Sequence, residues 1–192
     1  MRVGSIATAL GLLAMTAGCS GVRVYEPLDG QNYYDGAFQY ATQKHEIDTV
    51  VLGTPFGPAA SDDIAAITTA HMKGATEGPV VSFKPVAWAG AGDGNNGFRV
   101  VVLFDGKSPF IDDDLCKDGP SIETAPGASP VTMHAAFCEG PNLISSASGE
   151  VGSLSGPQDP KFRQLVREVA HAMIPAVDKN AISNDSGAVL TN

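Results

Sequence analysis

Apolar runs along the chain predict a domain of strands and helices between residues 47 and 176. The strongest run is 98–104, FRVVVLF, in which Phe98, Val100, Val102 and Phe104 face one way and Val101 and Leu103 face the other. A strand that is apolar on both faces is typical of the covered centre of a sheet. Shorter β-branched runs predict further strands at 50–52, at 80–85, where Pro85 ends the run, at 131–138, and at 142–151 with a turn at Ser148-Gly149.

Apolar positions spaced three and four apart predict two helices. The first has Ser61 as its cap and ends at Gly74, and the second has Asp159 as its cap and Pro160 at its first position. The stripe of the second helix consists of Phe162, Leu165, Val166, Val169 and Met173. The order of elements predicts an α+β domain, with a mainly antiparallel sheet of about five strands and two helices packed on one face.

The segments on either side of this body contain few apolar residues. Residues 19–46 are polar with several aromatics, and we expect a partly ordered tether with a hairpin turn at Asp35-Gly36. Its tyrosines are candidates either for binding a partner or for packing against the body, and we favour packing. Residues 177–192 are small and polar, which predicts a flexible tail.

The first 18 residues have the pattern of a secretory signal peptide. Arg2 precedes an apolar run from Ile6 to Met15, which is too short to span a membrane. The following TAGC resembles the lipobox of bacterial lipoproteins, although Thr16 stands where that family usually has Leu. The resemblance implies that Cys19 is lipidated, and that Ser20 directs the protein to the outer membrane, facing the periplasm. The alternative is a secreted protein with a spare thiol.

The other two cysteines, Cys116 and Cys138, are expected to form a disulfide outside the cytoplasm. The bridge would stabilise the fold by roughly 3 kcal/mol in the loop-entropy model. A redox or metal pair is the weaker interpretation, because there is no C-x-x-C spacing and His134 alone does not complete four ligands.

The charge of the chain argues against a polyanionic partner. Its 21 acidic residues outnumber 12 basic ones, the net charge is −9, and no basic run is present. Nucleic acid binding is therefore disfavoured, since it depends on lysine and arginine replacing counterions.

Two polar stretches resemble ligand loops but do not complete them. The run GDGNNG at 92–97 has the spacing of a dinucleotide fingerprint, yet it opens a strand where the fingerprint must open a helix. The same stretch lacks the final glutamate of a calcium loop. Asp112, Asp113, Asp114 and Asp118 could hold Ca²⁺, but a solvated charge run is the commoner outcome. We therefore predict no metal and no cofactor.

Candidate catalytic residues are scattered. The serines Ser145, Ser146 and Ser148 lack the strand-turn-helix frame of a nucleophile elbow. The histidines are His45, His71, His134 and His171, and spacing alone pairs none of them with a nucleophile. We therefore predict no catalytic residue.

The body resembles a group of small proteobacterial lipoproteins. The resemblance covers residues 48–175 and rests on VVLGTPFG, FRVVVLFD, the isolated Cys116, AAFC and DPKFRQLV. It implies no activity, so two functions stay open. The favoured one is a non-enzymatic, lipid-anchored envelope protein that acts as an accessory or scaffold for another envelope component. The alternative is a periplasmic domain that binds or hydrolyses a small ligand in a pocket near Gly53–Gly57 and the glycine-rich loop.

Overall fold

The computed structural model describes residues 21–174, except 26, 58–62, 77–79, 91–93, 95 and 108. The signal peptide, Cys19, the expected cap Ser61, half of the glycine-rich loop and the C-terminal tail lie outside the described residues. Within the described part of the chain, every helix is too short or too polar to cross a membrane.

The strands form one mixed sheet in the order β1-β7-β6-β5-β3-β4, with β2 also paired to β7. β3 runs parallel to both β4 and β5, whereas all the other pairs are antiparallel. In this sheet order the strands are β1 (Arg23–Val24), β7 (Asn142–Val151), β6 (Val131–Glu139), β5 (Phe98–Phe104), β3 (Glu46–Leu52) and β4 (Ser82–Pro85), and β2 is Leu28–Asp29.

The expected mainly antiparallel sheet of about five strands with two helices on one face is wrong. The sheet has seven strands and mixed direction, and four helices accompany it in the described residues. α2 (Ile64–Met72) connects β3 to β4, and a helical crossover of this kind returns the chain in the same direction. β1 and β2 come from the segment expected to be a tether.

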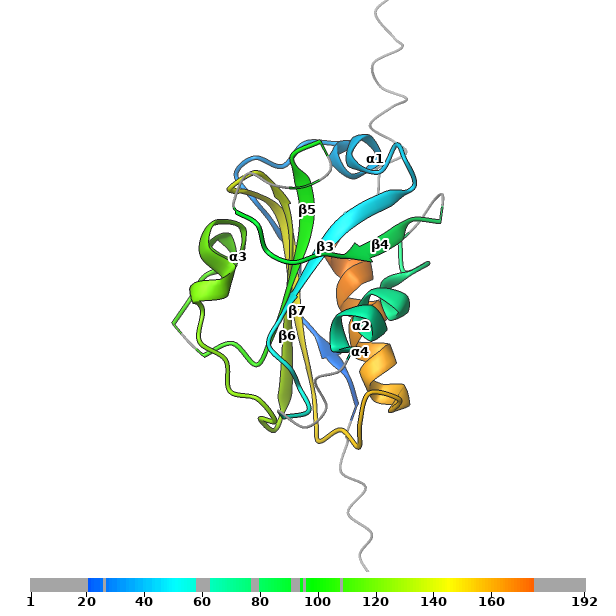
Figure 1. Cartoon of the computed structure of the whole chain (residues 1–192), viewed down its shortest axis with the longest axis vertical. Helices are drawn as coiled ribbons and strands as arrows, with labels where there is room; N and C mark the ends of the chain where they lie inside the picture. The colour runs from blue at the N-terminus through cyan, green and yellow to red at the C-terminus, as the bar shows by residue number, and fades with distance from the viewer. Residues whose placement is uncertain are drawn as a thin grey trace, which may run out of the picture.

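The helices cover both faces of the sheet (Figure 1). α2 and α4 (Pro160–Met173) lie on one face, and α3 (Asp112–Asp118) lies on the other. α1 (Ala37–Ala41) lies at the end of the sheet where β3 begins. Asp159 caps α4 by accepting a hydrogen bond from the backbone N–H of Lys161, as the sequence predicted.

β5 separates two apolar cores. Phe98, Val100, Val102 and Phe104 belong to the larger core under α2 and α4. Val101 and Leu103 belong to a smaller core under α3. All seven residues of β5 are buried, which confirms the expectation of a covered central strand.

Two predicted turns are wrong. Gly36, with φ of 83°, precedes α1 and forms no hairpin, and the buried Phe38 and Ala41 of α1 face the core. At the other predicted turn β7 continues to Val151. A Cβ at Gly149 would lie 2.8 Å from the backbone oxygen of Arg23, so this glycine allows β1 to approach β7 closely.

The predicted disulfide is confirmed. Cys116 in α3 is bonded to Cys138 in β6, with their Cα atoms 5.6 Å apart. Both residues are fully buried in the smaller core. The bridge therefore fastens α3 to the face of the sheet.

Candidate functional site

The acidic run at 112–114 forms the first turn of α3 and does not lie in a loop. Asp112 faces the sheet, whereas Asp113 forms an ion pair with Lys117 one turn along. Asp114 accepts a hydrogen bond of 3.0 Å from the backbone N–H of Ile111. The three neighbouring carboxylates therefore have three different environments, and of the three only Asp112 contacts the strands of the sheet.

The carboxylate of Asp112 joins residues that are far apart in the sequence. Its Oδ1 lies 3.2 Å from Nδ1 of His134 on β6, and its Oδ2 accepts a 2.7 Å hydrogen bond from the hydroxyl of Ser146 on β7. The ring of Phe110 stands edge-on to His134, with centroids 4.9 Å apart. We call Asp112, His134 and Ser146 the Asp112 cluster.

Alternation along β7 selects which serine takes part in the cluster. Ser146 points to the α3 face, whereas the neighbouring Ser145 donates a 2.6 Å hydrogen bond to the carbonyl of Met173 in α4. Successive side chains of a strand point to opposite faces, so adjacent serines serve different layers.

Two opposing effects set the charge of Asp112. Its side chain is only 16% exposed, and this burial raises the pKa of the carboxyl. The hydrogen bonds from His134 and Ser146 lower the pKa, and together with the charge of His134 they outweigh burial. The net pKa is below the ordinary value for aspartate, so Asp112 is ionised at neutral pH.

The Asp112 cluster contains the residue types of a hydrolytic triad in a different arrangement. In a triad the hydroxyl bonds to the imidazole, which accepts its proton, and the carboxylate orients the imidazole. Here the hydroxyl of Ser146 donates to the carboxylate itself. This arrangement holds α3 on the sheet and does not activate the serine as a nucleophile.

An open groove of about 500 Å³ lies next to the cluster. One wall is the N-terminal segment 28–32, and the other is formed by Ile111 and α3. Leu28 and Ile111 are 60% and 66% exposed, and the lining also includes the charged residues Asp29, Asp112, Asp113 and Lys117. The groove therefore combines exposed apolar side chains with a mainly acidic lining.

A second constellation surrounds Arg99, the one polar residue of β5. Arg99 is only 2% exposed, and its guanidinium donates hydrogen bonds to the carbonyls of Gly90 (2.6 Å), Cys116 (2.7 Å) and Gly140 (3.2 Å). It also lies 4.5 Å from the ring centroid of Trp88. Sequence reasoning did not identify this residue, although a single arginine inside an apolar strand was the available signal.

The pocket expected from Gly53–Gly57 and the glycine-rich loop is divided into two separate cavities. A cavity of about 130 Å³ beside Arg99 is lined by residues that include Trp88, Gly90 and Gly94. Another of about 410 Å³ is lined by Pro55, Phe56 and two other loops. The two linings share no residue, so the described parts of the two expected segments line different cavities.

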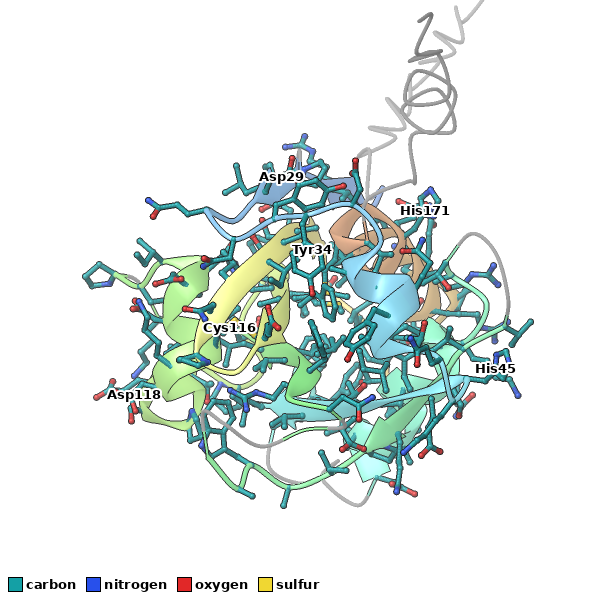
Figure 2. All side chains as sticks on the ribbon, turned by 90° about the horizontal axis from the view of Figure 1, so that it is seen from above. Asp29, Tyr34, His45, Cys116, Asp118 and His171 are labelled. Atoms are coloured by element: carbon teal, nitrogen blue, oxygen red, sulfur yellow. A yellow bond between two sulfur atoms is a disulfide. The ribbon has the colours of Figure 1, made fainter. Side chains whose placement is uncertain are left out.

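The remaining histidines lie apart from the Asp112 cluster. His45 and His171 are on the opposite side of the molecule from Asp118 in α3 (Figure 2). His171 Nδ1 lies 2.9 Å from the carbonyl oxygen of Ala75. The ring of His71 stands edge-on to Phe162, and burial lowers its pKa. Among the described residues, no group of three or more acidic, histidine or cysteine side chains could hold a metal ion.

No protein-family model and no curated protein matches the sequence. Among solved structures, the chain is similar to the PelC dodecamer from Paraburkholderia phytofirmans and to a variant of that protein. The identity is 10% in both cases, and each match covers 79% of this chain and 97% of the other, with TM-scores of 0.41 and 0.40. A similarity this weak carries no argument about function.

Proposed function

We propose that this protein is a non-enzymatic, lipid-anchored protein of the bacterial envelope, which acts as an accessory or scaffold for another envelope component. Cys19 attaches it to the outer membrane, and the body faces the periplasm. The resemblance of TAGC to the lipobox supports the anchor. The disulfide between Cys116 and Cys138 supports an oxidising compartment, and it uses two of the three cysteines.

The groove beside α3 is the observation that carries the scaffold function. Leu28 and Ile111 expose large apolar side chains on its two walls, where contact with another protein would remove them from water. Asp29 adds negative charge to the same surface, whereas the charge of Asp113 is balanced by its ion pair with Lys117. This combination favours a partner that presents apolar side chains with basic groups around them.

The contacts of Asp112, which lines the groove, support binding more than catalysis. Both oxygens of Asp112 already have partners, His134 and Ser146, inside the protein. A partly buried carboxylate whose two oxygens both have partners rigidifies the surface next to it. The groove therefore has a fixed shape, which lowers the entropic cost of docking a partner.

In-cell photocrosslinking tests this function. A photoreactive amino acid at Ile111 is compared with the same amino acid at Val80, which is similarly exposed at 61% but does not line the groove. We expect a defined envelope protein to be captured from position 111 and not from position 80. Reversing the groove charge with Asp29→Lys and Asp113→Lys should remove the capture. Equal capture from both positions, or capture that survives the reversal, contradicts the proposal.

A hydrolytic function is the second candidate, because a histidine oriented by a carboxylate is one part of many hydrolytic sites. The pair of Asp112 and His134 is the specific observation in its favour. Turnover of an envelope substrate by the purified body, lost in His134→Gln and retained in His71→Gln, would establish this alternative in place of the scaffold.

A further inference from the structure

The chain between the proposed anchor and the folded body is short. Arg23 and Val24 already pair with Glu150 and Gly149 of β7, and Val22 packs against the larger core. Three residue steps separate Cys19 from Val22, and an extended chain spans at most ~3.6 Å per residue, or about 11 Å in total. A lipid on Cys19 would therefore hold the start of β1 close to the membrane.

The register of the sheet identifies which part of the body lies beside the start of β1. Arg23 is opposite Glu150 near the end of β7, and Val151 is opposite Val131, where β6 begins. β3 and β5 finish at this same end, and α4 begins there, at the lower end of Figure 1. We call the segments 53–57, 124–131 and 151–158 the loop end.

The loop end is uncharged. Its three segments contain no lysine, arginine, aspartate or glutamate, in a chain of which 17% is charged. They consist largely of glycine, serine and proline, and they line the cavity of about 410 Å³. Among the charges that flank them, Arg23 pairs with Glu150 at 3.6 Å and Lys107 pairs with Glu123 at 3.2 Å, while Asp63, Asp159 and Lys161 stand at the starts of α2 and α4.

Most of the acidic residues that the structure describes lie away from the loop end. Asp29 and Glu139 lie toward the opposite end of the sheet, and the acids of α3 lie on its side. Phospholipid surfaces in bacteria carry negative charge, which acts over a Debye length of ~8 Å at physiological ionic strength. An uncharged end can rest within that distance of the surface, whereas the acidic parts are repelled from it.

We propose that the loop end rests against the phospholipid surface that holds Cys19, an inference that depends on the lipid anchor of the proposed function. The short connection brings this end to the membrane, and the absence of charge removes the repulsion that the rest of the body would meet. The groove beside α3 then lies on the side of the body, away from the membrane surface. In this position it is accessible to a partner in the periplasm.

Depth-dependent fluorescence quenching on the full-length lipidated protein tests this orientation. The protein is reconstituted in vesicles of phosphatidylethanolamine and phosphatidylglycerol that contain headgroup-labelled quencher lipids. A fluorescent amino acid is placed at Ser153 in the loop end or, as the matched control, at Gln43, an exposed position at the opposite end. We expect quenching at Ser153 to be severalfold stronger than at Gln43. A flexible insertion of about 20 residues after Ser20, with an end-to-end distance of ~25 Å, should reduce the difference.

Flotation of the vesicles separates failure of the anchor from failure of the orientation. Protein that does not float with the vesicles overturns the anchor and, with it, the orientation. Protein that floats but shows equal quenching at the two positions, or stronger quenching at Gln43, overturns the orientation and leaves the anchor standing. A difference that survives the long insertion unchanged shows that the short connection does not set the orientation.

Discussion

Asp105, which is buried, and Asp112, which is partly buried, have pKa values shifted in opposite directions, because their oxygens meet different donors. Asp112 receives hydrogen bonds from His134 and Ser146, and its pKa is lowered despite burial. Asp105, only 2% exposed, has its pKa raised by burial, and the backbone N–H of Thr132 opposes this only in part. Asp112 therefore favours folding in its charged form, whereas Asp105 does so in its neutral form.

Replacing Asp112 by asparagine should lower the free energy of unfolding at neutral pH by about 1.5–3 kcal/mol, the value of hydrogen bonds to a charged group. Because the folded pKa is depressed, this contribution is present above the ordinary pKa of about 3.9 and is lost as pH falls through the folded value. Urea unfolding across the acid range should therefore show a shallower fall for Asp112→Asn than for the wild type. Asp113→Asn, which removes a surface ion pair, should cost at most about 1 kcal/mol.

Asp105 should respond in the opposite way. Its folded pKa is raised, so its contribution to stability falls as pH rises from about 3.9 through the folded value. Asp105→Asn keeps an oxygen for the 2.9 Å hydrogen bond from Thr132 and tolerates the φ of 49°, so it should be as stable as the wild type, or more stable, at neutral pH. Asp105→Ala should lose about 2 kcal/mol, from the hydrogen bond and the left-handed backbone. Urea midpoints in the reverse order would contradict this account.

The residues of the candidate site could be identified as candidates from the sequence, but the contacts between them could not be predicted. Asp112, His134 and Ser146 were each considered, and they are brought together only because β6 and β7 pair and α3 packs across them. No local pattern encodes a contact between residues 22 and 34 positions apart. Arg99 is the reverse case, because its unusual place in an apolar strand was local and was overlooked.

At the scale of elements, long periodic segments were predictable and their arrangement was less so. The strands at 98–104 and 131–139 and the helix at 160–173 follow their apolar patterns. The parallel pairing was missed although a strand, a helix and a strand follow one another between Glu46 and Pro85, which is the order of a parallel crossover. β1 and β2 have two residues each, too few for any alternation to be recognised.

α3 depends on its covalent bond to the sheet, because it has only seven residues and an isolated helix of that length is not stable. Replacing Cys116 and Cys138 together by alanine should lower the free energy of unfolding by about 3 kcal/mol in the loop-entropy model. Amide hydrogen exchange in α3 should accelerate more than in α4 on the opposite face. Loss of stability with equal acceleration in both helices would show that the bridge acts only on the unfolded chain.

At the scale of the whole molecule, the described residues of the segment 19–46, which was expected to be a partly ordered tether, belong to the folded body. Its described residues supply β1, β2 and α1, and Ala37, Phe38 and Ala41 are buried in the larger core. A partner that binds the groove would therefore bind a body that is held close to the membrane and is not attached through a long flexible linker. Anchoring raises the effective concentration of the groove at a fixed distance from the membrane surface. A weak contact with the partner then suffices for function.

Lipidation of Cys19 is the prediction on which this geometry depends. Cys19→Ala should abolish incorporation of radioactive palmitate and release the protein from membranes, because a body without a spanning helix among its described residues would have lost its proposed attachment. The urea midpoint of the released body should equal that of the anchored protein, since β1 begins to pair only at Arg23 and the disulfide does not involve Cys19. Palmitate labelling that continues in Cys19→Ala would contradict the anchor, and a lowered midpoint would show that residue 19 or its lipid contributes to the stability of the fold.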